Sequence, residues 1–344
     1  KGVLLLILTV IMIVGIYKIK PYYANVTENV IAYSQAHFPN NTELNEKHPY
    51  YVKSNHKIKG YFDTIEDAIE SGDKYKRSIV IDAQNNEWVW NNYAPFIILT
   101  EHGVQDFDRL ESAIYYAKRN SYRQIYWKDN KKIVWDLDEQ LPKDILLDVP
   151  VVLQYPELPR GCEVTSLAMI LEYLGININK LELAENIKKD TTPYSKDENG
   201  RITFGNPYDG FVGDMYNIKN PGYGVYHGPI VELLEQYVPG QVIDLTGSNI
   251  EDLLYFVAKD MPVWVVANST YKPLKDEGFQ IWHTPTGIVK ITYREHAIVI
   301  TGYSEKYIYL NDPLRSKKNI KVDRKKFVAA WEQMGNQAVV VYKD

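Results

Sequence analysis

The sequence of 344 residues predicts a protein of the α+β class with three successive parts. Three observations support this division: an apolar run near the N-terminus, an internal repeat in the first half, and a second half in which helical and strand periodicities alternate. A chain of this length has room for two domains that each bury their own core. We therefore expect an N-terminal transmembrane helix, a duplicated small α+β repeat module and a larger α+β domain, in that order.

The N-terminal part is the apolar run from Val3 to Tyr17, which has lysines on both sides. A run of about fifteen residues is short for a membrane span, but flanking lysines and tyrosines can extend it to both interfaces. A cleaved signal peptide is the alternative. No convincing small-x-small cleavage site follows the run, and the nearest candidate is Tyr23-Ala24. We expect residues 1–20 to be a single-pass membrane anchor, with the rest of the chain extracytoplasmic. If the segment is cleaved, the protein is secreted.

Two kinds of segment follow this run. Residues 21–49 are polar and rich in asparagine, without clear periodicity, and predict a linker. Residues 50–140 contain a repeat with a period of 45 residues, in which Phe62-Asp63 matches Phe107-Asp108 and Val89-Trp90 matches Val134-Trp135. Each unit predicts a strand, a short helix, a strand, a turn and a strand. Because such small units bury little alone, we expect them to pack together and to bind a cell-wall or protein partner.

Cys162 is the only cysteine of the chain and follows a turn of proline and glycine. Apolar residues recur at helical spacing from Cys162 until Gly175 stops the pattern, so the sulfur belongs to the first turn of a helix. Unpaired N–H groups and the helix dipole favour a thiolate at that position. A lone cysteine with histidine and an acidic residue far downstream is typical of a cysteine hydrolase. A buried structural cysteine is the alternative.

A hairpin supplies the candidate partners of this cysteine. His296 opens the strand 297–302, and a second strand, 307–310, returns to Asp312. With a turn centred between residues 304 and 305, the residue opposite His296 is Pro313, so that Asp312 lies one position away. A carboxylate there fixes the imidazole tautomer and leaves the other nitrogen to accept the proton of Cys162. Asn311 is the alternative orienting residue, because the register is assumed.

Gln154 precedes the cysteine by eight residues and ends the apolar run 145–153, which predicts a short strand. Its side-chain amide and the backbone N–H of Cys162 are candidate donors to the negative oxygen of a tetrahedral intermediate. A surface glutamine before a turn is the alternative.

These segments together resemble a known family. Gln154, Pro-Arg-Gly-Cys162-Glu, His296-Ala-Ile-Val-Ile-Thr-Gly-Tyr and Asn311-Asp312-Pro313 are similar to the cysteine peptidases of family thirty-nine type. The resemblance places a papain-like peptidase domain at residues 146–344. It implies a papain-like fold, a nucleophile at Cys162, a general base and acid at His296, an orienting Asp312 and an oxyanion donor at Gln154. The leader peptidases of this type are fused to transporters, whereas this chain resembles the exported, stand-alone branch with a Gly-Cys-Glu signature.

The expected function is therefore hydrolysis of peptide bonds in a peptide or protein substrate, through a Cys-His-Asp triad. An amidase or transpeptidase acting on cell-wall peptides uses the same triad, and a surface binding protein without activity is a further alternative. The net charge of −5 is spread along the chain, which argues against a nucleic-acid partner. No Cys-x-x-Cys, His-Glu-x-x-His or dinucleotide fingerprint is present, so we expect no cofactor and no metal.

Two further expectations concern the C-terminal half. Residues 188–214 are polar, rich in glycine and interspersed with aromatic residues, which predicts a long loop bordering the substrate cleft together with residues 223–229. The segment 262–267 predicts a central strand. His227 and His283 are exposed-loop candidates that lack an acidic partner of the kind the hairpin brings to His296.

Overall fold

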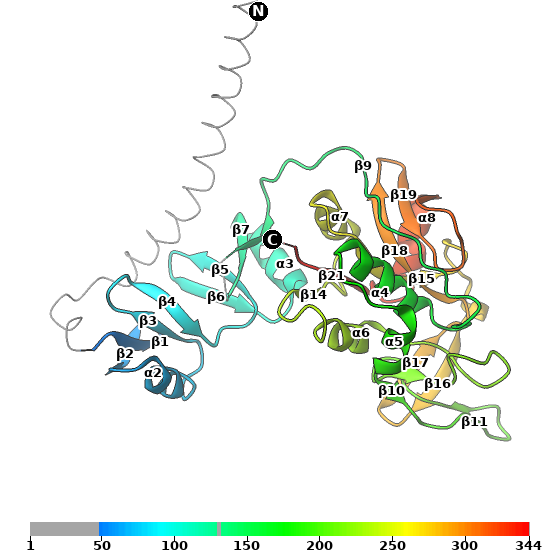
Figure 1. The fold of residues 1–344 in the computed structure, drawn as a ribbon, viewed down its shortest axis with the longest axis horizontal. Helices are drawn as coiled ribbons and strands as arrows, with labels where there is room; N and C mark the ends of the chain where they lie inside the picture. Colours follow the sequence, from blue (N-terminus) through cyan, green and yellow to red (C-terminus); the bar gives the residue numbers. More distant parts are fainter. Residues whose placement is uncertain (1–47, 129–131, 344) are drawn as a thin grey trace, which may run out of the picture. The chain divides into compact units, whose positions relative to one another are not determined.

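The computed structural model describes residues 48–128 and 132–343, and the chain divides into two compact units (Figure 1). The N-terminal unit comprises Lys1–Asp108 with Ser112–Leu137, and the C-terminal unit comprises Arg109–Glu111 with Asp138–Asp344. The predicted membrane segment 1–20, and the predicted linker up to residue 47, lie outside the described residues. Among the helices of the described part, none has the length and apolar character needed to span a bilayer.

The N-terminal unit contains two four-stranded sheets, each with one helix. The first has the strand order β2-β1-β3-β4 and the second the equivalent order β6-β5-β7-β8. Both sheets have an irregularity at the same place, between Val80 and Ile81 in one and between Ile125 and Tyr126 in the other. The elements of the first are β1 Tyr50–Ser54, β2 Lys57–Phe62, α2 Ile65–Gly72, β3 Ser78–Asp82 and β4 Glu87–Asn91. Those of the second are β5 Phe96–Thr100, β6 Gly103–Phe107, α3 Leu110–Asn120, β7 Gln124–Trp127 and β8 Ile133–Asp136.

Strands β2 and β6 are absent from the sequence prediction, which gave each unit three strands instead of four. Neither strand has a buried apolar row that would mark it in the sequence, since β2 is exposed or half-buried along its whole length and β6 is half-buried from Val104 to Phe107. Hydrogen bonds to β1 and β5 hold these strands in the sheets.

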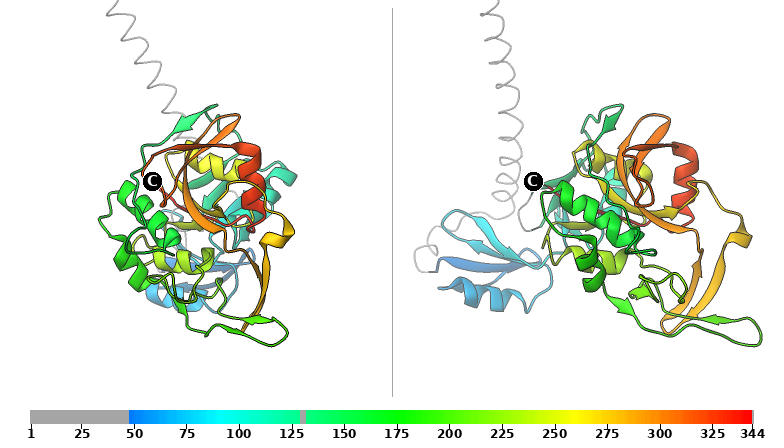
Figure 2. Two further views of the ribbon diagram at one scale, coloured as in Figure 1. Left: turned by 90° about the vertical axis from the view of Figure 1, so that its right-hand side faces the viewer. Right: turned by 45° about the vertical axis from the view of Figure 1, so that its right-hand side comes forward.

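A sheet with the strand order β14-β21-β15-β18-β19-β20 forms the centre of the C-terminal unit, and β9 pairs with β18 beside it. The predicted strand 262–267 is confirmed as β15, which is buried along its whole length. Helix α4 packs against β15 and β18, and Figures 1 and 2 show it in green beside the orange strands. The bounds are β9 Ile145–Leu146, α4 Cys162–Tyr173, β14 Val242–Asp244, α7 Ile250–Ala258, β15 Val263–Asn268, β18 Glu295–Tyr303, β19 Tyr307–Asn311, β20 Ile320–Asp323, α8 Arg324–Glu332 and β21 Ala338–Val341.

The remaining elements come from two stretches of the chain, one between α4 and β14 and one between β15 and β18. The prediction that residues 188–214 form a long loop was wrong in part, because this segment contributes four short strands to two small sheets. Strand β12 runs parallel to β16 and joins residues far apart in the sequence. The bounds are α5 Lys180–Asn186, β10 Lys189–Asp190, β11 Ser195–Lys196, β12 Ile202–Thr203, β13 Phe211–Val212, α6 His227–Leu234, the 3₁₀ helix Asp276–Gly278, β16 Gln280–Thr284 and β17 Gly287–Ile291.

Candidate active site

Cys162 is the first residue of α4, as the sequence predicts. The preceding Gly161 occupies a turn with no room for a side chain, since a Cβ atom there would lie 2.6 Å from Cβ of Leu158. The cysteine itself is 7% exposed. The chain thus places a nearly buried sulfur at the start of a helix by means of a tight turn.

The thiol is held in its neutral form. Its Sγ donates a hydrogen bond to Oε2 of Glu163 at 3.3 Å. Burial raises the pKa of the thiol well above its ordinary value of 9.0, and Glu163 and Glu295 raise it further, whereas the backbone N–H of Ala297 lowers it. The prediction that the helix start favours a thiolate is therefore wrong for this arrangement, because burial and two carboxyl groups outweigh the helix dipole.

His296 and Asp312 form a buried pair at one end of the central sheet. Nε2 of His296 lies 2.7 Å from Oδ1 of Asp312, and the two residues are 3% and 1% exposed. Asp312 also accepts hydrogen bonds from the hydroxyl of Tyr271 at 2.6 Å and the backbone N–H of Leu314 at 2.9 Å, and Nε of Arg315 lies 3.1 Å away. With Nε2 engaged by the carboxylate, Nδ1 is the imidazole nitrogen left for proton exchange with another group.

The carboxyl group of Asp312 stays ionised in this environment. Burial by itself raises its pKa, but the hydrogen bond and charge of His296, with the donors Tyr271 and Leu314, lower the pKa to about 2. An acceptor-only carboxylate is the form that holds a histidine in one tautomer.

This lowered pKa predicts a loss of stability in acid. A carboxyl group with a pKa of about 2 in the folded chain and an ordinary value of 3.8 contributes stability above about pH 4, which is lost as the pH falls to about 2. The difference corresponds to about 2 kcal/mol. We expect the free energy of urea unfolding to fall more steeply between pH 5 and pH 2 in the wild type than in Asp312→Asn. Parallel pH profiles for the two proteins would contradict this assignment.

The hairpin delivers Asp312 with a register that differs from the predicted one. The strand ladder pairs Val299 with Asn311 and Gly302 with Tyr309, and an irregularity between Ile300 and Gly302 shifts the pairing by one residue. A bulge in the ladder therefore replaces the regular hairpin assumed from the sequence. Asp312 lies just beyond the last pair and reaches His296 through its side chain.

Asn311, the alternative orienting residue, has other partners. Its side-chain amide donates to the carbonyl groups of Val149 at 2.9 Å and Pro150 at 3.1 Å, and its oxygen accepts from the backbone N–H of Asn319 at 2.8 Å. Asn311 thus ties the segment after β9 to the hairpin, and Asp312 is the residue that contacts the histidine.

Gln154 lies near these groups but is not at the end of a strand, because β9 ends at Leu146 and the rest of the predicted strand is irregular. Its backbone N–H donates to the carbonyl of Pro313 at 2.9 Å, and its Nε2 donates to the carbonyl of Pro159 at 2.9 Å. The residue is 3% exposed, and its Oε1 has no hydrogen-bond partner. Gln154 therefore bridges the two segments that carry Asp312 and Cys162, and one Nε2 hydrogen remains for a further acceptor.

The structure brings Cys162 next to the histidine strand without a hydrogen bond between the two catalytic candidates. The backbone N–H that acts on the thiol belongs to Ala297, the residue after His296. Among the described residues, the side-chain hydrogen bond of the thiol is to Glu163 and that of the imidazole is to Asp312.

Sequence reasoning missed two acidic residues of this site. Sγ of Cys162 and one carboxylate oxygen each of Glu163 and Glu295 all lie within 4.8 Å of one another. Glu163 is completely buried, and its Oε1 accepts a hydrogen bond from the backbone N–H of Val225 at 2.7 Å. The available signals were a glutamate directly after the lone cysteine and a second glutamate directly before His296.

Arg160, two residues before the cysteine, organises a neighbouring loop. Its guanidinium donates to four backbone carbonyl groups at 2.8–2.9 Å, which belong to Asp214, Asn217, Ile218 and Asn220. A planar guanidinium suits several acceptors at once, which a lysine ammonium cannot reproduce. The turn that positions the cysteine is thereby joined to a loop more than fifty residues away in the sequence.

His227, a competing candidate in the sequence, has an acidic partner after all. It is the first residue of α6, and its Nδ1 lies 2.7 Å from Oδ2 of Asp244 on β14. The prediction of an exposed loop position was wrong, because His227 starts α6 and its side chain is 21% exposed. Its acidic partner comes from β14 and not by a hairpin like that of His296. His283, the other candidate, lies on β16.

The aromatic residues of the segment 188–214 are divided between core and surface. Phe204 and Phe211 are buried at 2% and 1% exposure, whereas Tyr194 and Tyr208 are 38% and 43% exposed. Phe204 packs on Trp282 with 5.3 Å between ring centroids. The role of this segment at the substrate cleft stays a prediction, and the exposed tyrosines are its candidate contacts.

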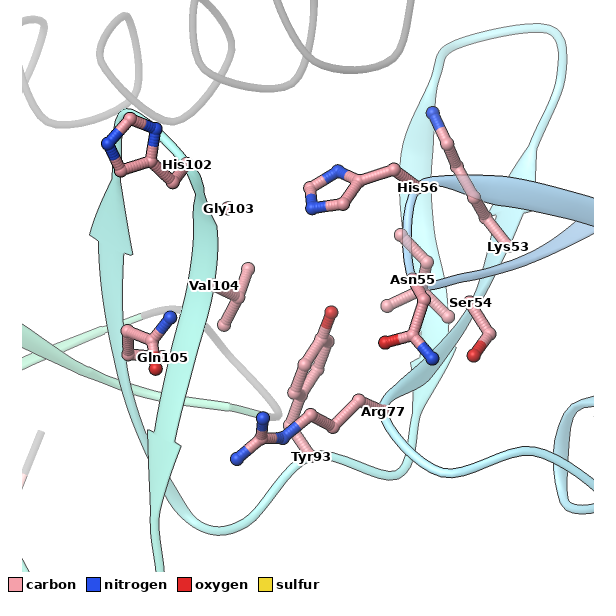
Figure 3. A pocket seen from close by; sticks show the side chains of 11 residues that line it. Lys53, Ser54, Asn55, His56, Arg77, Tyr93, His102, Gly103, Val104 and Gln105 are labelled. Carbon is pink, nitrogen blue, oxygen red and sulfur yellow. The ribbon is translucent and has the colours of Figure 1, made fainter.

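The N-terminal unit has a pocket of about 140 Å³ between the β1–β2 turn of its first sheet and the β5–β6 turn of its second sheet (Figure 3). Figure 3 shows His56 and His102 on opposite sides of it, with the hydroxyl of Tyr93 directed between them. Nε of Arg77 lies 2.7 Å from Oδ1 of Asp106. The lining residues are Lys53, Ser54, Asn55, His56, Arg77, Ile79, Tyr93, His102, Gly103, Val104 and Gln105.

Comparison with known proteins identifies the C-terminal unit. Residues 146–339 match the model of the Peptidase_C39 like family. The uncharacterized protein YvpB of Bacillus subtilis (strain 168) is 46% identical over 188 residues, which cover 55% of this chain and 71% of that protein. A crystal structure of a Bacillus anthracis protein assigned to the C39-like peptidases is 44% identical and covers 59% of this chain and 99% of its own, with a TM-score of 0.55. The chain therefore belongs to the C39-like peptidase family.

Proposed function

We propose that this protein is a cysteine peptidase that hydrolyses peptide bonds through Cys162, His296 and Asp312, in a papain-like arrangement. The observation that supports it most is the buried pair of His296 and Asp312, with 2.7 Å between Nε2 and Oδ1, beside a cysteine that starts a helix. Membership of the C39-like peptidase family supports the same chemistry.

In the first step, the Cα–Cβ bond of Cys162 rotates so that the thiol turns from Glu163 to the free Nδ1 of His296. Nδ1 accepts the thiol proton, and the sulfur attacks the carbonyl carbon of the peptide. The backbone N–H of Cys162 and the remaining Nε2 hydrogen of Gln154 stabilise the negative oxygen of the tetrahedral intermediate. His296 then donates its proton to the leaving amine as the C–N bond breaks, and a thioester remains on Cys162.

In the second step, His296 removes a proton from water, and the oxygen attacks the thioester carbon. The C–S bond breaks, the carboxylic acid product leaves, and the sulfur regains a proton. Asp312 stabilises the imidazolium that forms in both steps, because its carboxylate accepts the Nε2 hydrogen throughout.

The test of this function is detection of the thioester. The protein is mixed with a library of peptides, quenched rapidly in acid and digested, and the peptide that contains Cys162 is analysed by mass spectrometry. We expect a substrate-derived acyl group on Cys162 and new peptide termini in solution. Peptide cleavage without any acyl group on Cys162, or no cleavage of any peptide, would overturn the proposal.

An amidase or transpeptidase acting on cell-wall peptides forms the same thioester. The two are separated by the acceptor of the acyl group, which is water for hydrolysis and an amine for transfer. Product analysis in the presence of added amino acid amides therefore distinguishes them.

A surface binding protein without activity is the second candidate function. The observation that favours it is the neutral thiol, which is hydrogen-bonded to Glu163 and not to His296. The rate of alkylation of Cys162 against pH, in the wild type and in His296→Ala, decides this point. Reactivity that depends on His296 supports the peptidase. Equally slow labelling of both proteins supports the binding protein only if His296 is also without effect when the hydrogen bond of the thiol to Glu163 is removed in Glu163→Gln.

The same proposal covers the rest of the chain. Residues 1–20 anchor the protein in the membrane with the catalytic unit extracytoplasmic, and the N-terminal unit binds a cell-wall or protein partner. Support for a binding role comes from the pocket in Figure 3, whose polar lining includes His56 and His102 on opposite sides. Imidazole N–H groups that line one pocket can donate hydrogen bonds to an acidic group of the partner.

This role predicts binding that depends on the two turn histidines. We expect the double variant His56→Ala/His102→Ala to lose at least about tenfold in affinity for sulfated dextran, an acidic polymer probe. Isothermal titration measures the affinity, and His48→Ala, which removes an imidazole that bonds Asp63 at 2.6 Å outside the pocket, is the matched control. An equal loss in both variants would argue against the pocket as the binding site.

A further inference from the structure

Two carboxyl groups next to the nucleophile, that of the buried Glu163 and that of the half-buried Glu295, have no part in the proposed mechanism. Glu163 lies on α4 and Glu295 at the start of β18, and one oxygen of each lies within 4.8 Å of the other and of Sγ of Cys162. Within the described residues, no lysine, arginine or histidine forms an ion pair with either carboxyl group. Two negative charges this close, buried and without a cation, cannot coexist.

The contacts show which of the two carries the charge. Glu163 accepts hydrogen bonds from the backbone N–H of Val225 at 2.7 Å and from the thiol of Cys162 at 3.3 Å. Oε1 of Glu295 has no hydrogen-bond partner. Hydrogen-bond donors stabilise an ionised carboxylate, so Glu163 is the ionised member and Glu295 the protonated one.

The titration behaviour agrees with this assignment. Burial raises the pKa of Glu163 to about 7, with its hydrogen bonds opposing the rise. Burial raises the pKa of Glu295 well above its ordinary value, and the charge of Glu163 raises it further. Tyr223 and Tyr226 pack nearby and stay neutral, because burial raises the pKa of both above the ordinary value.

We propose that Glu163 and Glu295 hold a single proton between them, and that the ionised Glu163 is a positioning residue that keeps Cys162 as a neutral thiol turned away from His296 until substrate is bound. This inference rests on the proposed function, in which Cys162 is the nucleophile. It adds a resting state that protects the sulfur, because the thiol, not the thiolate, is the form that reacts slowly with electrophiles and oxidants.

The local backbone is built around this pair. A Cβ atom on Gly224 would lie 2.2 Å from Oε1 of Glu163 and 3.1 Å from Oε2 of Glu295. The absence of a side chain there lets the chain approach closely enough for the N–H of Val225 to reach Glu163. The indole N–H of Trp264 donates to the backbone carbonyl of Glu163 at 3.1 Å and fixes the glutamate from the sheet side.

The experiment compares alkylation of Cys162 by iodoacetamide in the wild type, Glu163→Gln and Glu295→Gln. In Glu163→Gln the new oxygen still accepts from Val225 and the new amide N–H faces the sulfur, so a donor replaces the acceptor. We expect labelling of Glu163→Gln at pH 8, above the pKa of about 7 of Glu163, to be at least about tenfold faster than that of the wild type. Glu295→Gln keeps the charge on Glu163, so its rate is expected within about threefold of the wild type.

The outcomes separate this inference from the proposed function. Unchanged or slower labelling of Glu163→Gln overturns the inference, and so does a rate for Glu295→Gln that equals the Glu163→Gln rate. The same comparison in the His296→Ala background tests the function. An equal acceleration by Glu163→Gln with and without His296 leaves the inference in place and removes the Cys–His pair from the mechanism.

A second measurement does not depend on the folding of Glu163→Gln. Infrared difference spectra of the wild type at pH 8, above the pKa of about 7 of Glu163, are expected to contain the C=O band of a buried protonated carboxyl group, and this band is expected to vanish in Glu295→Gln. A wild-type spectrum without any protonated carboxyl band at pH 8 overturns the shared proton.

Discussion

His296→Ala is expected to lower kcat/KM for peptide hydrolysis by at least about 10⁴-fold. The effect is large because burial raises the pKa of the Cys162 thiol well above its ordinary value, so hardly any thiolate forms without a base. Asp312→Ala is expected to lose about 10³-fold, since the imidazole then lacks the carboxylate at Nε2 and the charge that stabilises the imidazolium.

The chain contains a matched control for this prediction. His227 also has a carboxylate partner, with 2.7 Å between its Nδ1 and Oδ2 of Asp244. His227 belongs to α6, however, and not to the strand beside Cys162. His227→Ala is expected to leave kcat/KM within about threefold of the wild type. Steady-state kinetics on the peptide identified by acyl-enzyme trapping measures all three variants. If His296→Ala and His227→Ala lose activity equally, general instability and not catalysis explains the loss.

Gly224→Ala is expected to destabilise the C-terminal unit by about 3 kcal/mol or more. The added Cβ atom would lie 2.2 Å from Oε1 of Glu163, closer than any real Cβ contact. The carboxylate cannot retreat without breaking its hydrogen bonds to Val225 and Cys162, which leaves a buried charge without donors. The backbone at Gly224 is equally confined, because its carbonyl accepts from the N–H of Val212 at 3.0 Å.

Gly228→Ala is the control, because it lies four residues further along, inside α6. A Cβ atom there meets only the carbonyl oxygen of Tyr208, at the ordinary contact distance of 3.5 Å. Alanine also has a higher helix propensity than glycine, so we expect a change of no more than about 1 kcal/mol. Urea unfolding followed by tryptophan fluorescence compares the two variants. Equal stabilities would mean that the Glu163 carboxylate is not fixed where the structure places it.

The parts of the site that depend on local pattern were predictable. The bounds of α4 follow from local features: a turn before it, apolar residues at helical spacing, and Gly175 after its end. Cys162 is the first residue of this helix, as predicted. The apolar run of β15 identified the middle of the sheet. The pairing of His296 with Asp312 was found because both lie at the open ends of one hairpin, which tolerates a register error of one residue.

The parts that depend on distant segments were not predictable. Gly302 lies at the β-bulge of the hairpin, where a Cβ atom would be 2.4 Å from the carbonyl oxygen of Ile145. Ile145 is far from the hairpin in the sequence, so this contact could not be predicted from the residues around Gly302. Burial of Glu163 has the same origin. A glutamate at a helix start normally faces water and complements the dipole, and only the loop at Gly224 and Val225 encloses this one.

The order of the active-site residues along the chain has a consequence for when the protein becomes active. Cys162 is synthesised before β18 and β19, which bring its candidate base and orienting residue, and β20 and β21 follow them in the chain. A nascent or truncated chain that ends before β18 therefore carries the sulfur without either group. Under the proposed function, such an unfinished chain lacks the base that would activate its cysteine.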